Sequence, residues 1–259
     1  MTKLTTLFKK NDRFSKFIER QDGRDFPFYN DKPFGLATWQ WLVVSLSAGV
    51  GMAALILIPQ TSNLEALLPR ILFLAMPLGV FMFFTKGQWR LLFYKPTFAD
   101  YRTMLGFFIL NLALTGIVAV VVMNLFGANA NPATNGLAQA GVLEIIAFYV
   151  GTGIQLLGEE VFTILPFLAI MYLFYKKGKV SRKSAVIWAW VLTAVWFAAA
   201  HLPTYGWNVA QALLVIGTAR IVLTLAYIRT KNLWVSYGAH LLNDWVIFTF
   251  ALIAASAKG

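Results

Sequence analysis

Residues 141–175 read GVLEIIAFYVGTGIQLLGEEVFTILPFLAIMYLFY, an apolar run interrupted by the adjacent acids Glu159 and Glu160. A helix needs only ~20 apolar residues to cross the hydrocarbon core of a bilayer. As a single helix this run would extend ~50 Å at ~1.5 Å per residue, whereas the core is ~30 Å thick. We predict one helix that tilts strongly or bends at a glycine or at Pro166. The alternative is two crossings, which would move the basic segment after residue 175 to the opposite side.

The rest of the chain has the composition of a membrane protein. Hydrophobic residues make up 59% of the 259 residues, charged residues only 13%, and the mean hydropathy is +0.66. Long apolar runs indicate helices, because a helix satisfies its own backbone hydrogen bonds in lipid. We predict an all-α polytopic bundle over residues 35–259, with about seven transmembrane helices, or eight if 141–175 divides. The other expected spans are 36–58, 67–85, 103–126, 184–201, 206–228 and 233–255.

Loops rich in lysine and arginine alternate along the chain with loops that are neutral. The segment before the first span and the loops after the second, fourth and sixth spans are basic, and the other loops are nearly free of basic residues. The positive-inside bias then predicts a cytoplasmic N-terminus. The same distribution explains the net charge of +11 without a nucleic-acid partner. There is no cysteine, which excludes disulfides and thiolate sites.

The first 34 residues are polar and basic. An apolar helical face predicts an amphipathic cytoplasmic helix on the anionic inner leaflet, with a solvated tail as the alternative. The residues of that face are Leu4, Leu7, Phe8, Phe14 and Ile18.

Ionisable side chains within apolar sequence are costly in a membrane and by default mark a functional site. Glu159 and Glu160 point ~100° apart on a helix, so we expect different roles for them. One would be a general base or a metal ligand and the other an orienting group; the alternative is a helix end at the membrane surface. These residue types can activate water or hold a metal ion.

The chain has only two histidines, and both lie in apolar sequence. His201 follows Phe197 by one helical turn, and its alternative role is to cap a helix. His240 and Asp244 are four residues apart and share a helical face, with Asn243 within reach. The alternative here is an ordinary hydrogen bond between helix neighbours. The predicted spans place His201 near the outer face and His240 nearer the inner face, so a broken helix or an uneven helix start would be needed to bring them together.

Other intramembrane protease designs do not fit the sequence. There is no His-Glu-x-x-His motif, no second membrane aspartate and no glycine-framed serine beside a histidine. One glutamate and two histidines from three helices remain.

This ordered set resembles the CPBP family of intramembrane proteases, which includes CAAX prenyl endopeptidases and bacterial Abi or bacteriocin-immunity proteins. The resemblance covers about 141–245. It implies that Glu159, beside Glu160, acts with His201 to polarise a water molecule. It also implies that His240 and the residue at position 244 stabilise the oxyanion. A zinc ion held by Glu159, His201 and His240 would be chemically sensible.

Two positions depart from the family pattern. Ile164 stands where an arginine is usual, and Asp244 stands where asparagine is common. An ionised Asp244 cannot donate a hydrogen bond, so it must be protonated, orient His240 or leave the role to Asn243. Arg220 lies within a predicted span, where an unpaired cation is costly, so we expect it to pair with Glu160 or Asp244. The alternative is an arginine that snorkels to the surface.

The expected function is an intramembrane endopeptidase acting on a membrane-associated peptide or protein, with membrane lipid as its surroundings. The resemblance links it to peptide-leader processing or bacteriocin self-immunity and implies an integral protein of a bacterial cell membrane. The main alternative is a catalytically silent scaffold or immunity protein that binds a partner. A weaker one is a small proton-coupled transporter, although paired discontinuous helices are absent from the sequence.

Overall fold

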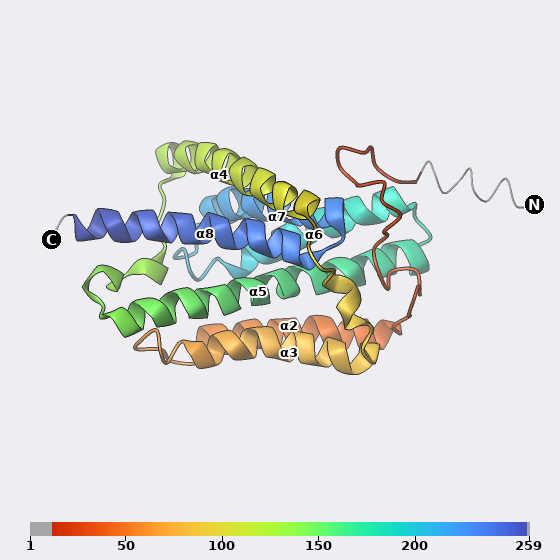
Figure 1. Ribbon diagram of the computed structural model, residues 1–259, viewed down its shortest axis with the longest axis horizontal. Helices are drawn as coiled ribbons and strands as arrows, with labels where there is room; N and C mark the ends of the chain where they lie inside the picture. The colour runs from red at the N-terminus through yellow and green to blue at the C-terminus, as the bar shows by residue number, and fades with distance from the viewer. Residues whose placement is uncertain (1–11, 258–259) are drawn as a thin grey trace, which may run out of the picture.

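The computed structural model describes residues 12–257, and its helices run side by side along one long axis (Figure 1). Within that range seven helices are long and apolar enough to cross a membrane, which confirms the all-α bundle. They contain α2 (Thr38–Leu57), α3 (Leu67–Thr85), α4 (Phe98–Phe126), α5 (Val142–Tyr172), α6 (Arg182–Ala200), α7 (Gly217–Thr230) and α8 (Leu233–Ser256). The spans of α5 and α7 also include a π-helical turn each, so they run from Val142 to Lys177 and from Gln211 to Thr230. Short 3₁₀ turns are η1 (Gln88–Leu92), η2 (Pro132–Thr134) and η3 (Leu137–Gln139), and π-helical turns are η4 (Leu173–Lys177) and η5 (Gln211–Ile216).

α5 is the central helix of the bundle (Figure 1). It is continuous from Val142 to Tyr172, with Pro166 inside it, and η4 prolongs it to Lys177. The prediction of one helix over 141–175 is therefore confirmed. α5 packs against α2, α3, α6 and α8, and most of its side chains are buried within the protein. Its apolar sequence mainly forms protein core, so its length does not have to match the lipid.

The remaining helices pack on opposite sides of α5. α2 and α3 form a hairpin against one side, while α4, α7 and α8 pack together on the other (Figure 1). α4 begins at Phe98 rather than 103, because Thr97 and Asp100 form a capping box. The span predicted from residue 206 begins instead at Gln211. Gly206 and Trp207 have φ values of +57° and +62°, which a right-handed helix excludes.

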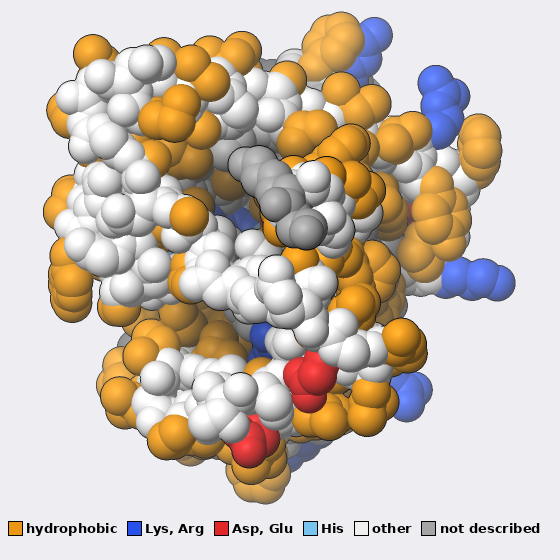
Figure 2. Space-filling model, turned by 90° about the vertical axis from the view of Figure 1, so that its left-hand side faces the viewer, with side chains coloured by type: hydrophobic (Ala, Val, Ile, Leu, Met, Phe, Trp, Pro, Cys, Tyr) orange, Lys and Arg blue, Asp and Glu red, His pale blue; other side chains and the backbone are white. Residues whose placement is uncertain are grey.

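The two ends of the bundle differ in charge. Figure 2 looks onto the end formed by the loops 58–66, 127–141 and 201–210, where neutral and apolar side chains dominate. The basic loops lie at the other end, together with residues 12–34. The bundle therefore has one basic and one neutral end.

Residues 12–34 contain no helix, so the predicted amphipathic helix is wrong for this part of the chain. Its earlier residues Leu4, Leu7 and Phe8 lie outside the described residues. The segment packs into the protein, with Phe26, Phe28 and Tyr29 almost completely buried in the main core. These aromatic side chains therefore pack on the protein core at the basic end of the bundle and do not face lipid.

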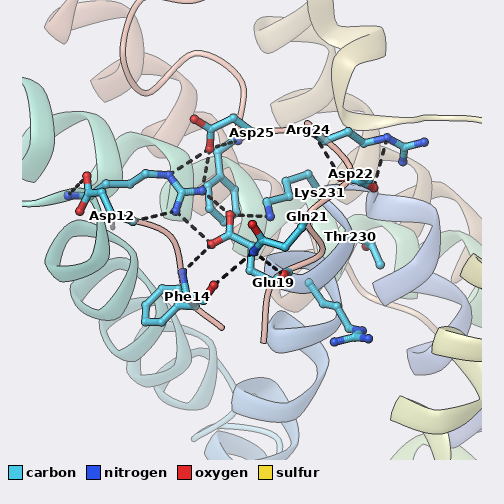
Figure 3. Close-up of polar contacts among 12 residues, drawn as sticks. Asp12, Phe14, Glu19, Gln21, Asp22, Arg24, Asp25, Thr230 and Lys231 are labelled. Atoms are coloured by element: carbon cyan, nitrogen blue, oxygen red, sulfur yellow. Dashed lines mark hydrogen bonds and ion pairs between the residues drawn. The ribbon is translucent and has the colours of Figure 1, made fainter. Parts of the chain in front are cut away.

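A buried ion cluster fixes this segment. The Glu19 carboxylate is fully buried and lies 2.5 Å from Arg182 Nη2 and 2.6 Å from Lys231 Nζ (Figure 3). Arg182 also contacts Asp25 at 2.6 Å. Burial raises the pKa of Glu19, but the two cations outweigh it and hold that pKa below its usual value. Burial lowers the pKa of Lys231 to about 8, although Glu19 opposes this. The cluster joins residues 12–34 to α6 and to the α7–α8 turn.

Replacing Glu19 by glutamine should lower the free energy of unfolding by about 3 kcal/mol, because it leaves two buried cations without their shared carboxylate. The thermal midpoint of the purified protein in detergent measures this loss, and trypsin should then cut faster at Arg24. Asp22→Asn is the control, since the Asp22–Arg24 pair is partly exposed and 3.9 Å long. Equal midpoints for the two variants would contradict the prediction.

Candidate active site

A cavity of about 860 Å³ lies in the bundle toward its neutral end. Side chains from all seven long helices and from η5 line it, together with the loops of that end. Most of the residues singled out in the sequence face this one space. They are Glu159, Phe197, His201, His240, Asn243 and Asp244.

Glu160 and Arg220 lie behind the cavity wall and are fully buried. Arg220 Nη1 lies 2.8 Å from Glu160 Oε1, so the pair predicted from charge matching is confirmed and the snorkelling alternative is wrong. Arg220 Nε also donates to Thr224 Oγ1 at 3.1 Å, and the guanidinium lies 5.0 Å from the centre of the Phe197 ring. Glu160 is thus held in the interior by a cation from α7.

His240 is oriented by Glu160. Its Nδ1 atom lies 3.0 Å from Glu160 Oε1, and the carboxylate, ionised beside Arg220, accepts the Nδ1 hydrogen. The Nε2 atom lies 3.7 Å from Glu159 Oε2 and 3.8 Å from Asp244 Oδ2. Both distances are too long for a direct hydrogen bond. Nε2 therefore remains available to a substrate atom in the cavity.

Glu159 faces the cavity, and its Oε1 atom accepts a hydrogen bond of 3.0 Å from Gln155. Its neighbour Glu160 points into the protein, as the ~100° helical offset predicts. Both acids lie in the interior of α5, so the alternative of a helix end at the membrane surface is wrong. The two carboxylates differ in position: one meets the cavity and the other supports His240.

His201 is the C-cap residue of α6 and also lines the cavity. Its Nδ1 donates to the Phe197 carbonyl at 2.8 Å, because a carbonyl can only accept. In the neutral imidazole, Nε2 is then the acceptor nitrogen. The Phe197 ring lies between the two histidines, 4.5 Å from His201 and 6.4 Å from His240 between ring centres. α6 simply ends near the depth of the site, so no broken helix is needed to bring the histidines to one cavity. Within residues 12–257, no hydrogen bond or ion pair joins His201 to Glu159.

Asn243 and Asp244 complete the wall contributed by α8. Asn243 Nδ2 donates to Asp244 Oδ1 at 2.9 Å, and Asp244 Oδ2 is the oxygen that approaches His240. The aspartate accepts a hydrogen bond and lies beside an imidazole. This arrangement places the aspartate where it can orient the His240 ring.

Residues 138–246 match the family model for the type II CAAX prenyl endopeptidases, described as Rce1-like. This segment is similar to the Rce1-like proteins of the CPBP family. It extends from η3 into α8 and contains Glu159, Glu160, His201, His240 and Asp244. No curated protein and no solved structure matches the chain. The protein is thus an integral membrane protein with a segment that is similar to an intramembrane protease family.

The Rce1-like domain keeps a cation beside Glu160 despite Ile164. Ile164 is fully buried in the main hydrophobic core, one turn beyond Glu160 on α5. Arg220 reaches Glu160 from a different helix. The cation that the family pattern would place at position 164 is therefore supplied by Arg220 of α7.

Three cavity residues were not predicted from the sequence. Gln155 and Arg70 are polar residues within apolar helices, and the rule that found the glutamates could have found them too. Tyr205 gave no such indication, since it lies in what looks like a simple connection. Burial, followed by the charges of Asp244 and Glu159, raises the pKa of Tyr205 to about 12, so its hydroxyl stays protonated.

The histidines of the Rce1-like domain have the chemistry that a zinc site would need. Each has its Nδ1 hydrogen bonded, and a carboxylate on the Nδ1 of a histidine is a common support for a metal ligand. However, across residues 12–257 no group of three or more acid or histidine side chains is close enough together to hold an ion.

Proposed function

We propose that the protein is an intramembrane endopeptidase that hydrolyses a membrane-associated peptide or protein within the cavity. The observation that supports this most strongly is the placement of Glu159 and His240 Nε2 on one wall of the same space. Behind them, Glu160 and Arg220 hold His240 in a single orientation. A cavity of about 860 Å³ is large enough for several peptide residues.

In the proposed reaction Glu159 is the general base. A water molecule between Glu159 and His201 Nε2 attacks the peptide carbonyl carbon and gives its proton to Glu159. A C–O bond forms, and the carbonyl oxygen becomes an oxyanion. When the C–N bond breaks, Glu159 returns the proton to the leaving amine. The products are a carboxylic acid, which then loses its proton to water, and an amine.

The oxyanion needs hydrogen-bond donors at the opposite side of the scissile bond. His240 supplies one from Nε2 when its imidazole is protonated, with its Nδ1 hydrogen on Glu160. An ionised Asp244 cannot donate a hydrogen bond to the oxyanion. Its negative charge, 3.8 Å from Nε2, would instead favour the charged form of His240. The second amide hydrogen of Asn243 is a further candidate donor.

The resemblance supports two biological settings for this activity, peptide-leader processing and self-immunity against bacteriocins, with the basic end of the bundle in the cytoplasm. A zinc ion bound by Glu159, His201 and His240 is a separate proposal, and metal analysis of the purified protein tests it. The second candidate function is a catalytically silent scaffold or immunity protein, which the departure at Asp244 favours.

Cleavage of a library of apolar peptides by the purified protein in nanodiscs, followed by mass spectrometry, tests the proposal. His201→Ala and His240→Ala should each lower the rate by about 10²- to 10⁴-fold. Ser236→Ala is the matched control, because Ser236 lies one turn before His240 but bonds only to the Leu233 carbonyl. Full turnover in both histidine variants would contradict the mechanism. Partner binding or protection that survives in the absence of turnover would favour the silent scaffold.

A further inference from the structure

Arg70, near the start of α3, is a buried cation in the wall of the same cavity. Its side chain is only 7% exposed, and its Nε and Nη1 atoms have no hydrogen-bond partner. Among residues 12–257 it forms no ion pair within 4.0 Å. An unpaired buried cation is costly, and this one is outside the Rce1-like segment. Nothing in the hydrolytic mechanism uses it.

The chain makes room for this guanidinium. Arg70 lies directly against α5 at Gly151, where a Cβ atom would collide with its Nη1 atom and crowd its Cδ atom. Two acidic residues near this end of the bundle already accept hydrogen bonds from other protein groups. Glu65 accepts hydrogen bonds from Thr61, and Glu144 accepts one from the Asn63 amide. The guanidinium is therefore seated in the wall without a protein anion.

We propose that Arg70 binds a carboxylate of the peptide substrate. This inference rests on the proposed function. Gly151 precedes Glu159 by eight residues on α5, which corresponds to ~12 Å along the helix axis. An extended peptide covers ~3.3–3.6 Å per residue, so the carboxylate lies a few residues from the cleaved bond. Apolar side chains of α2 and α4, such as Leu55 and Leu112, line the space around that path.

Arginine suits this role because its guanidinium can form two parallel hydrogen bonds to a carboxylate. A lipid phosphate offers related chemistry. However, Arg70 lines the same cavity as Glu159 and His240, so a peptide bound for cleavage would bring its own carboxylate close to Arg70. Binding of a lipid phosphate instead is one of the outcomes that the test distinguishes.

The test uses the full chain in nanodiscs with three fluorescent apolar peptides that share one sequence except at a single internal position. One ends in a free carboxylate, one in an amide, and one in an amide with an internal glutamate. Binding is measured by anisotropy in a Glu159→Gln background, so that cleavage does not interfere. We expect at least one carboxylate peptide to bind about 10-fold or more tightly than the neutral peptide. Whether the terminal or the internal carboxylate is preferred identifies the source of the anion.

Arg70→Gln should abolish that preference, and Arg70→Lys should retain part of it. Gly151→Ala should also reduce it by displacing the guanidinium. Gly153→Ala is the control, since its new Cβ would meet Trp245 at an ordinary 3.4 Å. Without peptide, Arg70→Gln should melt no lower than its parent, because it removes an unpaired buried charge. A lower midpoint with an unchanged preference would assign Arg70 a structural role and overturn the proposal.

Equal binding of all three peptides to the parent protein would also overturn it. So would Arg70-dependent binding of phosphatidylglycerol, relative to phosphatidylcholine, without any peptide preference. Carboxylate preference in a protein that cleaves nothing would contradict the proposed function alone. Cleavage without carboxylate preference would contradict the role of Arg70 alone.

Discussion

Glu159→Gln should lower the rate of peptide cleavage by about 10³-fold or more while the protein stays folded. The glutamine amide cannot take a proton from water, and loss of a general base typically costs 10²- to 10⁴-fold. The Gln155 hydrogen bond can persist, because the glutamine carbonyl still accepts it. The measurement is the initial rate of product formation by mass spectrometry, together with the thermal midpoint.

The matched control for this variant is Glu144→Gln. Glu144 is in the first turn of the same helix, where its carboxylate accepts from the Asn63 amide outside the cavity. Its replacement should leave the cleavage rate within about 2-fold of the parent rate, because surface substitutions away from a site have small effects. Equal rates for Glu159→Gln and the parent would show that Glu159 is not the base.

Arg220→Met should cost about 3–5 kcal/mol in the free energy of unfolding and also remove activity. The substitution leaves Glu160 as a buried carboxylate without its cation, 2.8 Å from where the guanidinium was. Phe197 also loses the cation above its ring. The measurement combines the thermal midpoint in detergent with the cleavage rate.

The double variant Arg220→Met with Glu160→Gln separates stability from function. Removing both charges should restore much of the lost stability, since a buried pair contributes little more than apolar replacements. Activity should stay low, because a glutamine carbonyl can accept the His240 Nδ1 hydrogen but lacks the negative charge that favours a charged imidazole. Additive losses in the two single variants, with no recovery in the double, would contradict a direct interaction between Arg220 and Glu160.

Hydropathy was sufficient to predict the membrane helices, and charge matching was sufficient to predict one buried pair. α2 and α3 fall within two residues of their predicted bounds, because their apolar runs end at polar loops. The Arg220–Glu160 pair could be predicted since few acids lie in the spans, and a buried cation needs one of them.

Other features depended on packing that no local pattern encodes. The apolar residues Phe14 and Ile18 fit a membrane-surface helix as well as they fit an irregular segment packed on the core, and the structure has the second. The approach of His201 to His240 depends on where α6 ends. The left-handed residues Gly206 and Trp207, which delay the next helix, could not be read from hydropathy.

A single-turnover cleavage in water enriched in heavy oxygen is the most direct test of a Glu159-activated water. The parent protein should place one heavy oxygen atom in the new carboxyl terminus of the product, and Glu159→Gln should give no labelled product on the same timescale. Labelled product formed by Glu159→Gln at the parent rate would contradict the mechanism.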